Sequence, residues 1–249
     1  MRLKARSRAL SRTPRPNLRS QYLEGMRNLL PVLCLLAWTS AGLHGQTVEA
    51  VLSRMDKAAP SFHGMSANVK MTTHTAIIDD TEVESGTFKM QRLNGREVRA
   101  VLDFSGEKDA RQIGFLGKIV RIYYPKLKTY QDYDLGKNTD VLNQFLLLGF
   151  GSYGKDLAGS YGITSEGEEN LEGRDTTKLA LVPKNAEVTK RLSKIEMWVP
   201  NDAAYPIQQE FAEPSGNYRI VTYSDIKLNP PMRGKLELKL PSGVKKQSS

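Results

Sequence analysis

The spacing of apolar residues changes once along the chain, from a helical repeat to strict alternation. Val48, Val51 and Met55 recur at the spacing that lines one face of a helix, and Pro60 ends this segment. From Met65 onward apolar and polar residues alternate, as they do in strands with one buried face. The pattern predicts a short helix followed by a domain built mainly of β-strands.

The alternating segments are short and separated by turn residues. Asn94-Gly95 lies between two of them and is a strong hairpin signal. Many short strands with few, segregated helices predict one α+β domain, 46–249, with an antiparallel sheet of about 10–11 strands. The expected strands are 65–71, 86–92, 98–102, 112–116, 119–124, 129–131, 177–181, 195–199, 207–211, 217–226 and 236–240.

The segment from Val141 to Leu148 interrupts this alternation. Cap residues at 138–140 precede it, apolar residues cover most of its sides, and Gly149 and Gly151 follow it. We expect a short helix with two interpretations, a lid over a ligand or a helix packed in the core.

The first 45 residues have the pattern of a cleavable export signal. Arg27 precedes the apolar run Leu29–Trp38, and small residues lead to Gly45. This run is about half the length that spans a bilayer, so we expect export without a permanent anchor. Cleavage is expected after Gly45 or, alternatively, Gly42. The basic residues 1–25 are either a long start of the signal or lie upstream of a true start at Met26.

The signal also explains the charge of the chain. The whole sequence carries +9, but eight of its 36 basic residues and one of its 27 acidic residues precede Gln46. The remainder has 28 basic and 26 acidic residues, a net charge of +2. A nucleic-acid partner, which needs a basic surface on the folded part, is therefore not expected.

The residues after the signal carry no catalytic pattern. The only cysteine, Cys34, lies in the apolar run, where lipidation is the alternative interpretation, although Leu33 stands where a small residue is needed. No disulfide, thiol nucleophile or cysteine-based metal site is expected in the mature chain. His63 and His74 are isolated, and no nucleotide-binding, zinc-protease or serine-hydrolase motif occurs. We expect no enzyme, catalytic residue, cofactor or metal.

Five local strings, in their order along the chain, resemble the LolA family of periplasmic carriers of outer-membrane lipoproteins. They are Ser61-Phe62-His63-Gly64, Gly86-x-Phe88-x-x-Gln91-Arg92, Gly117-Lys118 leading to Tyr123-Tyr124-Pro125, Leu181-Val182-Pro183-Lys184, and Leu240-Pro241-Ser242-Gly243-Val244. Together they extend over nearly the whole mature chain.

The resemblance implies a strongly curved, open half-barrel with helices on its concave side. Acyl chains would bind in the apolar cavity between sheet and helices. Arg92 stands where the family has an arginine that holds the lid helices closed, and the alternative is an exposed arginine at a strand end. The expected cavity residues are Phe88, Met90, Val98, Ala100, Leu102, Val120, Ile122, Phe145, Leu146, Met197 and Phe211.

The resemblance implies a monomeric, non-enzymatic carrier of lipoproteins or other acylated lipids. Its partners would be an inner-membrane release complex and an outer-membrane receptor. The alternative function is a periplasmic domain that senses or binds a lipid or lipoprotein and acts through a protein partner. A lipid-modifying enzyme is the third alternative, for which the sequence offers no nucleophile or base.

Overall fold

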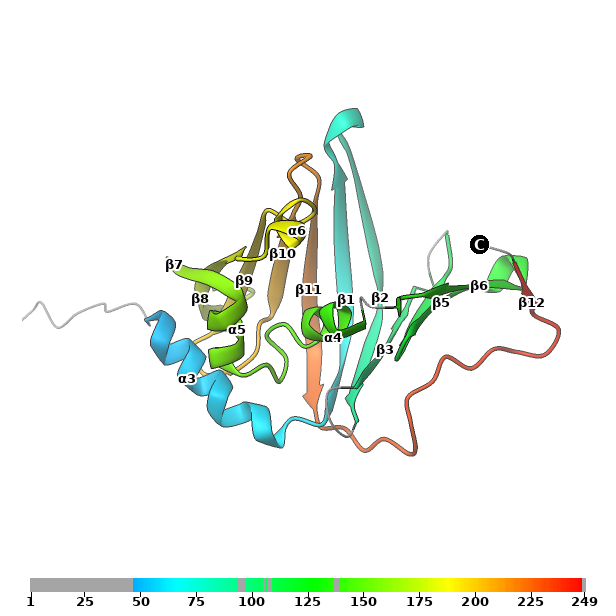
Figure 1. Ribbon diagram of the computed structural model, residues 1–249, viewed down its shortest axis with the longest axis horizontal. Coiled ribbons are helices and arrows are strands. Elements are labelled where there is room, and N and C mark those ends of the chain that lie inside the picture. The colour runs from blue at the N-terminus through cyan, green and yellow to red at the C-terminus, as the bar shows by residue number, and fades with distance from the viewer. Residues whose placement is uncertain (1–46, 94–96, 105, 107–108, 137–138, 248–249) are drawn as a thin grey trace, which may run out of the picture. The chain divides into compact units, whose positions relative to one another are not determined.

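A computed structural model of the chain describes residues 47–93, 97–104, 106, 109–136 and 139–247. The expected export signal and the Asn94-Gly95 turn lie outside these residues. Twelve strands of the described part form one sheet, which is not closed (Figure 1). They are β1 Gly64–Thr75, β2 Asp80–Arg92, β3 Val98–Asp103, β4 Gln112–Leu116, β5 Ile119–Tyr124, β6 Thr129–Asp134, β7 Tyr161–Leu171, β8 Arg174–Pro183, β9 Lys194–Pro200, β10 Gln208–Ala212, β11 Tyr218–Leu228 and β12 Lys245–Lys246.

The sheet consists of two antiparallel meanders that meet at β1. Its order is β12-β6-β5-β4-β3-β2-β1-β11-β10-β9-β8-β7. β1 therefore pairs with its neighbour in sequence, β2, on one side and with the distant β11 on the other. The predicted class, an α+β fold with a curved, open antiparallel sheet and few helices, is confirmed.

The helix α3, Val48–Ala58, is the one that the apolar spacing predicted. Thr47 caps its start by accepting a hydrogen bond from a backbone amide of the first turn. Val51 and Met55 are buried against the sheet, and the 3-10 turn Ala59–Ser61 ends the helix. We call the face of the sheet that the helices cover the inner face.

Two short helices follow β6. α4, Thr139–Leu146, is the predicted apolar helix, and α5, Gly154–Ser160, was not predicted. The chain turns between them at Gly149 and Gly151, whose φ angles are 78° and 73°. Gly151 also leaves room for Phe62, since a Cβ there would lie 2.2 Å from a carbon of its ring. A fourth, one-turn helix, α6, spans Ala186–Thr189.

The edge strand β7 was also missed, because the sequence there reads as a polar, glycine-rich connection. Most side chains of β7 are exposed and polar, so they show no alternation. The register shifts between Ser165 and Gly167. An irregular, acidic strand discourages further pairing at an open edge.

The prediction of a strand at Leu236–Leu240 was wrong. This segment crosses the outer face of the sheet, where the side chain of Gln91 accepts a hydrogen bond from the Leu236 amide (2.6 Å). Leu238 is buried against Gly114, where a Cβ would lie 2.9 Å from the leucine Cβ. The alternation thus reflects packing onto a sheet rather than pairing within it. Pairing begins only at β12, which runs parallel to β6.

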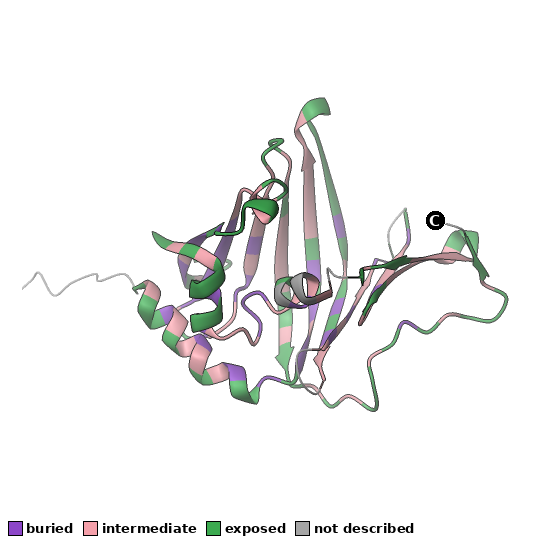
Figure 2. Cartoon of the chain, viewed as in Figure 1, coloured by how far each residue is buried: buried purple, intermediate pink, exposed green. Residues whose placement is uncertain are grey.

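Buried apolar residues form two clusters on the inner face. Figure 2 shows where buried residues occur along the chain. The central cluster joins β1, β2 and β3 to loop residues near the helices, and its members are Phe62, Met65, Ala67, Val69, Phe88, Met90, Val98, Ala100, Phe104 and Phe150. The helix-covered cluster joins α3 and α5 to β8 and β9, and its members are Val51, Met55, Leu148, Leu157, Leu179, Leu181, Ile195, Met197 and Val199.

Candidate functional site

Inward side chains of β2, β3, β4 and β5 form two rows across the sheet. The register that pairs these strands aligns them, because every second residue points to the same face. The first row is Phe88, Leu102, Ile113 and Ile122, and the second is Met90, Ala100, Phe115 and Val120.

Exposure increases along these rows. Phe88 and Met90 are buried, at 6% and 0% exposed, within the central cluster. Ala100 is also buried, whereas the other residues farther along the rows are only half-buried, although they are equally apolar. We call them the inner strip, which consists of Leu102, Ile113, Phe115, Val120 and Ile122. The strip is an apolar surface on β3 to β5 that the protein's own core does not fully cover.

The predicted cavity residues therefore fall into two groups. Leu102, Val120 and Ile122 belong to the half-buried inner strip. Phe88, Met90, Val98 and Ala100 are packed in the central cluster, and Met197 is packed in the helix-covered cluster. A ligand would reach this second group only if neighbouring side chains moved.

The α4 residues Phe145 and Leu146 lie over the inner face. Phe145 is 38% exposed, and its ring centroid is 4.9 Å from that of Phe211 on β10. Leu146 is partly buried against the central cluster. α4 thus contacts the sheet while leaving one of its aromatic rings accessible.

Two successive buried hydrogen bonds attach Leu148, just after α4, to the sheet. The Tyr223 hydroxyl donates to Gln209 Oε1 (2.8 Å), and Gln209 Nε2 donates to the Leu148 carbonyl (3.0 Å). Burial raises the pKa of Tyr223, so its hydroxyl remains a donor at neutral pH. These bonds satisfy a carbonyl at the helix end that would otherwise lack a partner.

Arg92 lies at the end of β2 and points inward with Phe88 and Met90. Its guanidinium donates to the carbonyl of Ala59 (3.0 Å), at the end of α3, and to the carbonyl of Gly151, after α4. Carbonyl acceptors for Arg92 are thus present at the ends of both helical segments. Whether the arginine acts as a lid latch stays a prediction.

The surroundings of Arg92 are apolar rather than acidic. Its guanidinium carbon lies 5.4 Å from the centre of the Phe62 ring, a cation–π arrangement. Burial lowers the pKa of Arg92, and no carboxylate forms an ion pair with it in the described part of the chain. Two carbonyl groups and a ring therefore hold this charge, and such contacts can be exchanged more readily than a buried ion pair.

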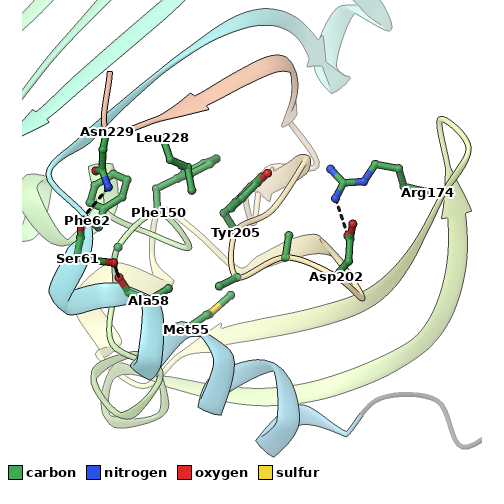
Figure 3. Close-up of a pocket in the computed structure, with 13 residues that line it drawn as sticks. Met55, Ala58, Ser61, Phe62, Phe150, Arg174, Asp202, Tyr205, Leu228 and Asn229 are labelled. Atoms are coloured by element: carbon green, nitrogen blue, oxygen red, sulfur yellow. Dashed lines mark hydrogen bonds and ion pairs between the residues drawn. The ribbon is translucent and has the colours of Figure 1, made fainter. Parts of the chain in front are cut away.

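A cavity of about 260 Å³ lies beside this contact, between the end of α3 and the β9–β10 loop (Figure 3). The sequence did not reveal it. Its apolar walls include Met55, Phe62, Phe150, Tyr205 and Leu228, and the ion pair of Arg174 and Asp202 lies at one end. Phe62 and Phe150 occurred in glycine-containing strings, but nothing in those strings indicated a cavity.

The described residues contain no group of three or more side chains suited to bind a metal ion. None of their helices is long and apolar enough to cross a bilayer. The arrangement offers apolar contacts and backbone hydrogen bonds.

Comparison with known proteins gives structural similarities only. No family model and no curated protein matches the chain. An uncharacterized conserved protein from Thermus thermophilus is 12% identical, with a TM-score of 0.49, covering 82% of this chain and 100% of its own. LprF from Mycobacterium bovis is 16% identical, with a TM-score of 0.45, covering 79% and 97%. A LolA superfamily protein from Nitrosomonas europaea is 16% identical, with a TM-score of 0.35, covering 75% and 96%. Each of these is a similarity of fold at low sequence identity.

Proposed function

We propose that this protein is a non-enzymatic periplasmic carrier that binds the acyl chains of lipoproteins and moves them from the inner to the outer membrane. The observation that carries the proposal is the half-buried inner strip. It provides an apolar surface beside a helix, α4, that also presents an exposed phenylalanine.

Acyl transport needs buried area rather than reactive groups. Each CH₂ group removed from water contributes about 0.8 kcal/mol. An open apolar strip can accept chains of different lengths, because dispersion and hydrophobic contacts are not directional. Ligand bound in this way can be released to an acceptor that offers a similar apolar surface.

Arg92 would act as the latch of this carrier. Its bonds to the Ala59 and Gly151 carbonyls join β2 to the ends of α3 and of the α4 segment. Entry of acyl chains between α4 and the strip would separate these groups, and their return would help to expel the ligand. A hydrogen bond to a charged group contributes about 1.5–3 kcal/mol, which is small enough for a contact that opens repeatedly.

Such a carrier would receive its ligand from an inner-membrane release complex and deliver it to an outer-membrane receptor. It would work as a monomer after removal of residues 1–45. If it bound ligand but never transferred it, the alternative role as a lipid or lipoprotein sensor would be favoured.

The test compares two substitutions on one strand, β5. Ile122→Asp places a charge in the inner strip, and Ile119→Asp places it at an exposed position on the opposite face. Protein purified from an envelope fraction is examined by native mass spectrometry for bound lipid. Transfer of lipoprotein from purified inner to outer membranes is measured separately.

We expect Ile122→Asp to lose bound lipid and transfer while remaining folded, and Ile119→Asp to keep both. Equal behaviour of the two variants, or wild-type protein without lipid and without transfer, would contradict the proposal.

A further inference from the structure

The cavity beside α3 is a compact site separate from the inner strip. Its volume of about 260 Å³ is slightly below the range of roughly 300–1,000 Å³ common for small-molecule pockets. None of the strip residues lines it. Its occupant would therefore be smaller than the lipid part of a lipoprotein, and a single chain fits better than two or three.

The walls of the cavity combine apolar and polar groups, and the apolar ones come from distant segments. Met55 and Ala58 belong to α3, Phe150 follows α4, Tyr205 lies in the β9–β10 loop and Leu228 ends β11 (Figure 3). Leu228 is 44% exposed. These surfaces would gain contacts from an apolar chain.

One end of the cavity is charged. Arg174 Nη2 lies 2.6 Å from Asp202 Oδ1, and Tyr205 also interacts with this guanidinium. Arg54 stands behind the same loop, donating to the carbonyls of Ala203 (2.9 Å) and Pro200 (3.4 Å). Two guanidinium groups and one carboxylate therefore meet at the β9–β10 loop.

We propose that this cavity binds a single-chain amphiphile with an anionic head group, its chain among the aromatic walls and its head on Arg174. Fatty acids and single-chain phosphate esters share this chemistry. The inference goes beyond the proposed function and does not depend on the inner strip.

The head group of such a ligand can replace Asp202 as the partner of Arg174 at the charged end of the cavity. The Asp202 side chain is 78% exposed, and surface pairs of this kind are weak because water and salt screen them. A ligand carboxylate or phosphate can accept the hydrogen bond that Arg174 donates to Asp202, and either group can also pair with a guanidinium through two hydrogen bonds. A ligand that also buries its chain in the cavity would therefore compete with Asp202 for Arg174.

The experiment titrates the purified chain with four probes by isothermal titration calorimetry, below their micelle concentrations. Laurate and dodecyl phosphate are anionic, dodecyl maltoside is uncharged and dodecyltrimethylammonium is cationic. We expect saturable binding of the anionic probes, at least tenfold tighter than that of the others, and the tighter of the two identifies the head group.

Two substitutions locate the probe. Arg174→Gln should weaken binding of the anionic probes roughly tenfold and leave dodecyl maltoside unchanged. Ala204→Phe should fill the cavity and abolish binding. The matched controls are Arg219→Gln, which removes an exposed arginine paired with Glu213, and Ala186→Phe, at an exposed position on α6. Circular dichroism and thermal melts verify that each variant is folded.

Three results would overturn the proposal: no saturable binding of either anionic probe, equal affinity for dodecyl maltoside, or unchanged binding in folded Arg174→Gln and Ala204→Phe proteins. The Ile122→Asp variant tests whether the probes bind in the cavity or on the inner strip. Probe binding that survives this substitution supports the cavity, whereas its loss places the probe on the inner strip and contradicts the proposal.

Discussion

The two meanders of the sheet carry the same alternation of apolar and polar residues but use it differently. In β8 and β9 the inward side chains Leu179, Leu181, Ile195 and Met197 are all fully buried beneath α3 and α5. In β4 and β5 the inward side chains are equally apolar but only half-buried. Figure 2 shows this contrast between the two sides of β1.

The difference shows that an apolar sheet face is not by itself a core. Alternation decides which way a side chain points, whereas helices supplied by other parts of the chain decide whether it is covered. The half-buried part of the inner face is the surface that the proposed function assigns to the ligand.

The sharpest test of this contrast replaces one inward side chain by alanine in each meander and compares the loss of stability. Met197→Ala should lower the free energy of unfolding by about 2–5 kcal/mol, because it leaves a cavity in a packed cluster. Ile122→Ala should lower it by about 1 kcal/mol or less, since the side chain is only partly buried and loses less contact. Urea unfolding of both variants measures the two values. Equal losses would mean that the strip is ordinary core.

Arg92→Leu should separate loading from release. The substitution removes the donors to the Ala59 and Gly151 carbonyls, and each of these hydrogen bonds contributes about 1.5–3 kcal/mol. We expect the variant to accept lipoprotein from inner membranes but to transfer it poorly to outer membranes, because closure no longer helps to expel the ligand. Arg99→Leu, which removes an arginine that contacts Glu97 and the Leu236 carbonyl instead, is the control. Transfer by Arg92→Leu at the wild-type rate would remove the latch from the mechanism.

Phe145→Asp or Leu146→Asp should abolish retention of ligand if α4 is a lid. Loss of the ring contact between Phe145 and Phe211 should cost about 0.5–1.5 kcal/mol of stability, so the protein stays folded. Retention is measured by co-purifying lipid, and stability by thermal melting. A melting temperature lower by many degrees, with retention intact in the folded fraction, would instead assign α4 to the core.

The smallest expected effect is the contribution of Asp132 to the pH dependence of stability. Hydrogen bonds from Arg121 to Asp132 (2.7 and 2.9 Å) hold the pKa of this carboxyl below its usual value, although burial opposes the shift. Because the pKa is lower in the folded than in the unfolded state, the stabilisation is present above the unfolded pKa of about 3.9 and is lost as pH falls through the folded pKa.

Asp132→Asn should therefore reduce the loss of unfolding free energy between neutral and acidic pH by about 1 kcal/mol or less. Unfolding free energies of both proteins, measured from pH 6 down to pH 2, give the difference. A difference that grows rather than shrinks toward low pH would contradict the assigned sign. Glu196→Gln makes the same comparison in the other meander. Burial there raises the pKa of Glu196, but hydrogen bonds from Lys194 and Lys178 outweigh burial, so the pKa is lowered overall.

The sequence predicted the inner face well, because period two fixes the direction of side chains in any paired strand. Phe88, Leu102 and Ile122 were each expected to line a cavity, and the register places them in one row. It could not separate the packed residues from the half-buried ones, because this depends on where α3, α4 and α5 lie.

The cavity beside α3 could not be predicted for a different reason. Phe62, Phe150 and Tyr205 come from three turns or loops, where no periodicity relates side-chain direction to position. Only the tertiary structure brings them together. The same holds for Leu238, whose alternating neighbours indicated a strand although the segment packs across one.

The position of β1 also has a consequence for how the protein folds. Each meander can form from neighbouring strands, but Met65 must pair with Leu228 near the other end of the domain. Contacts between residues so distant in sequence form slowly, because the chain between them must first be ordered. Until β1 and β11 pair, the apolar rows of both meanders are open to water. During that interval a newly made chain would be most prone to aggregate, and a substitution that weakens the β1–β11 pairing would lower the yield of folded protein more than its stability.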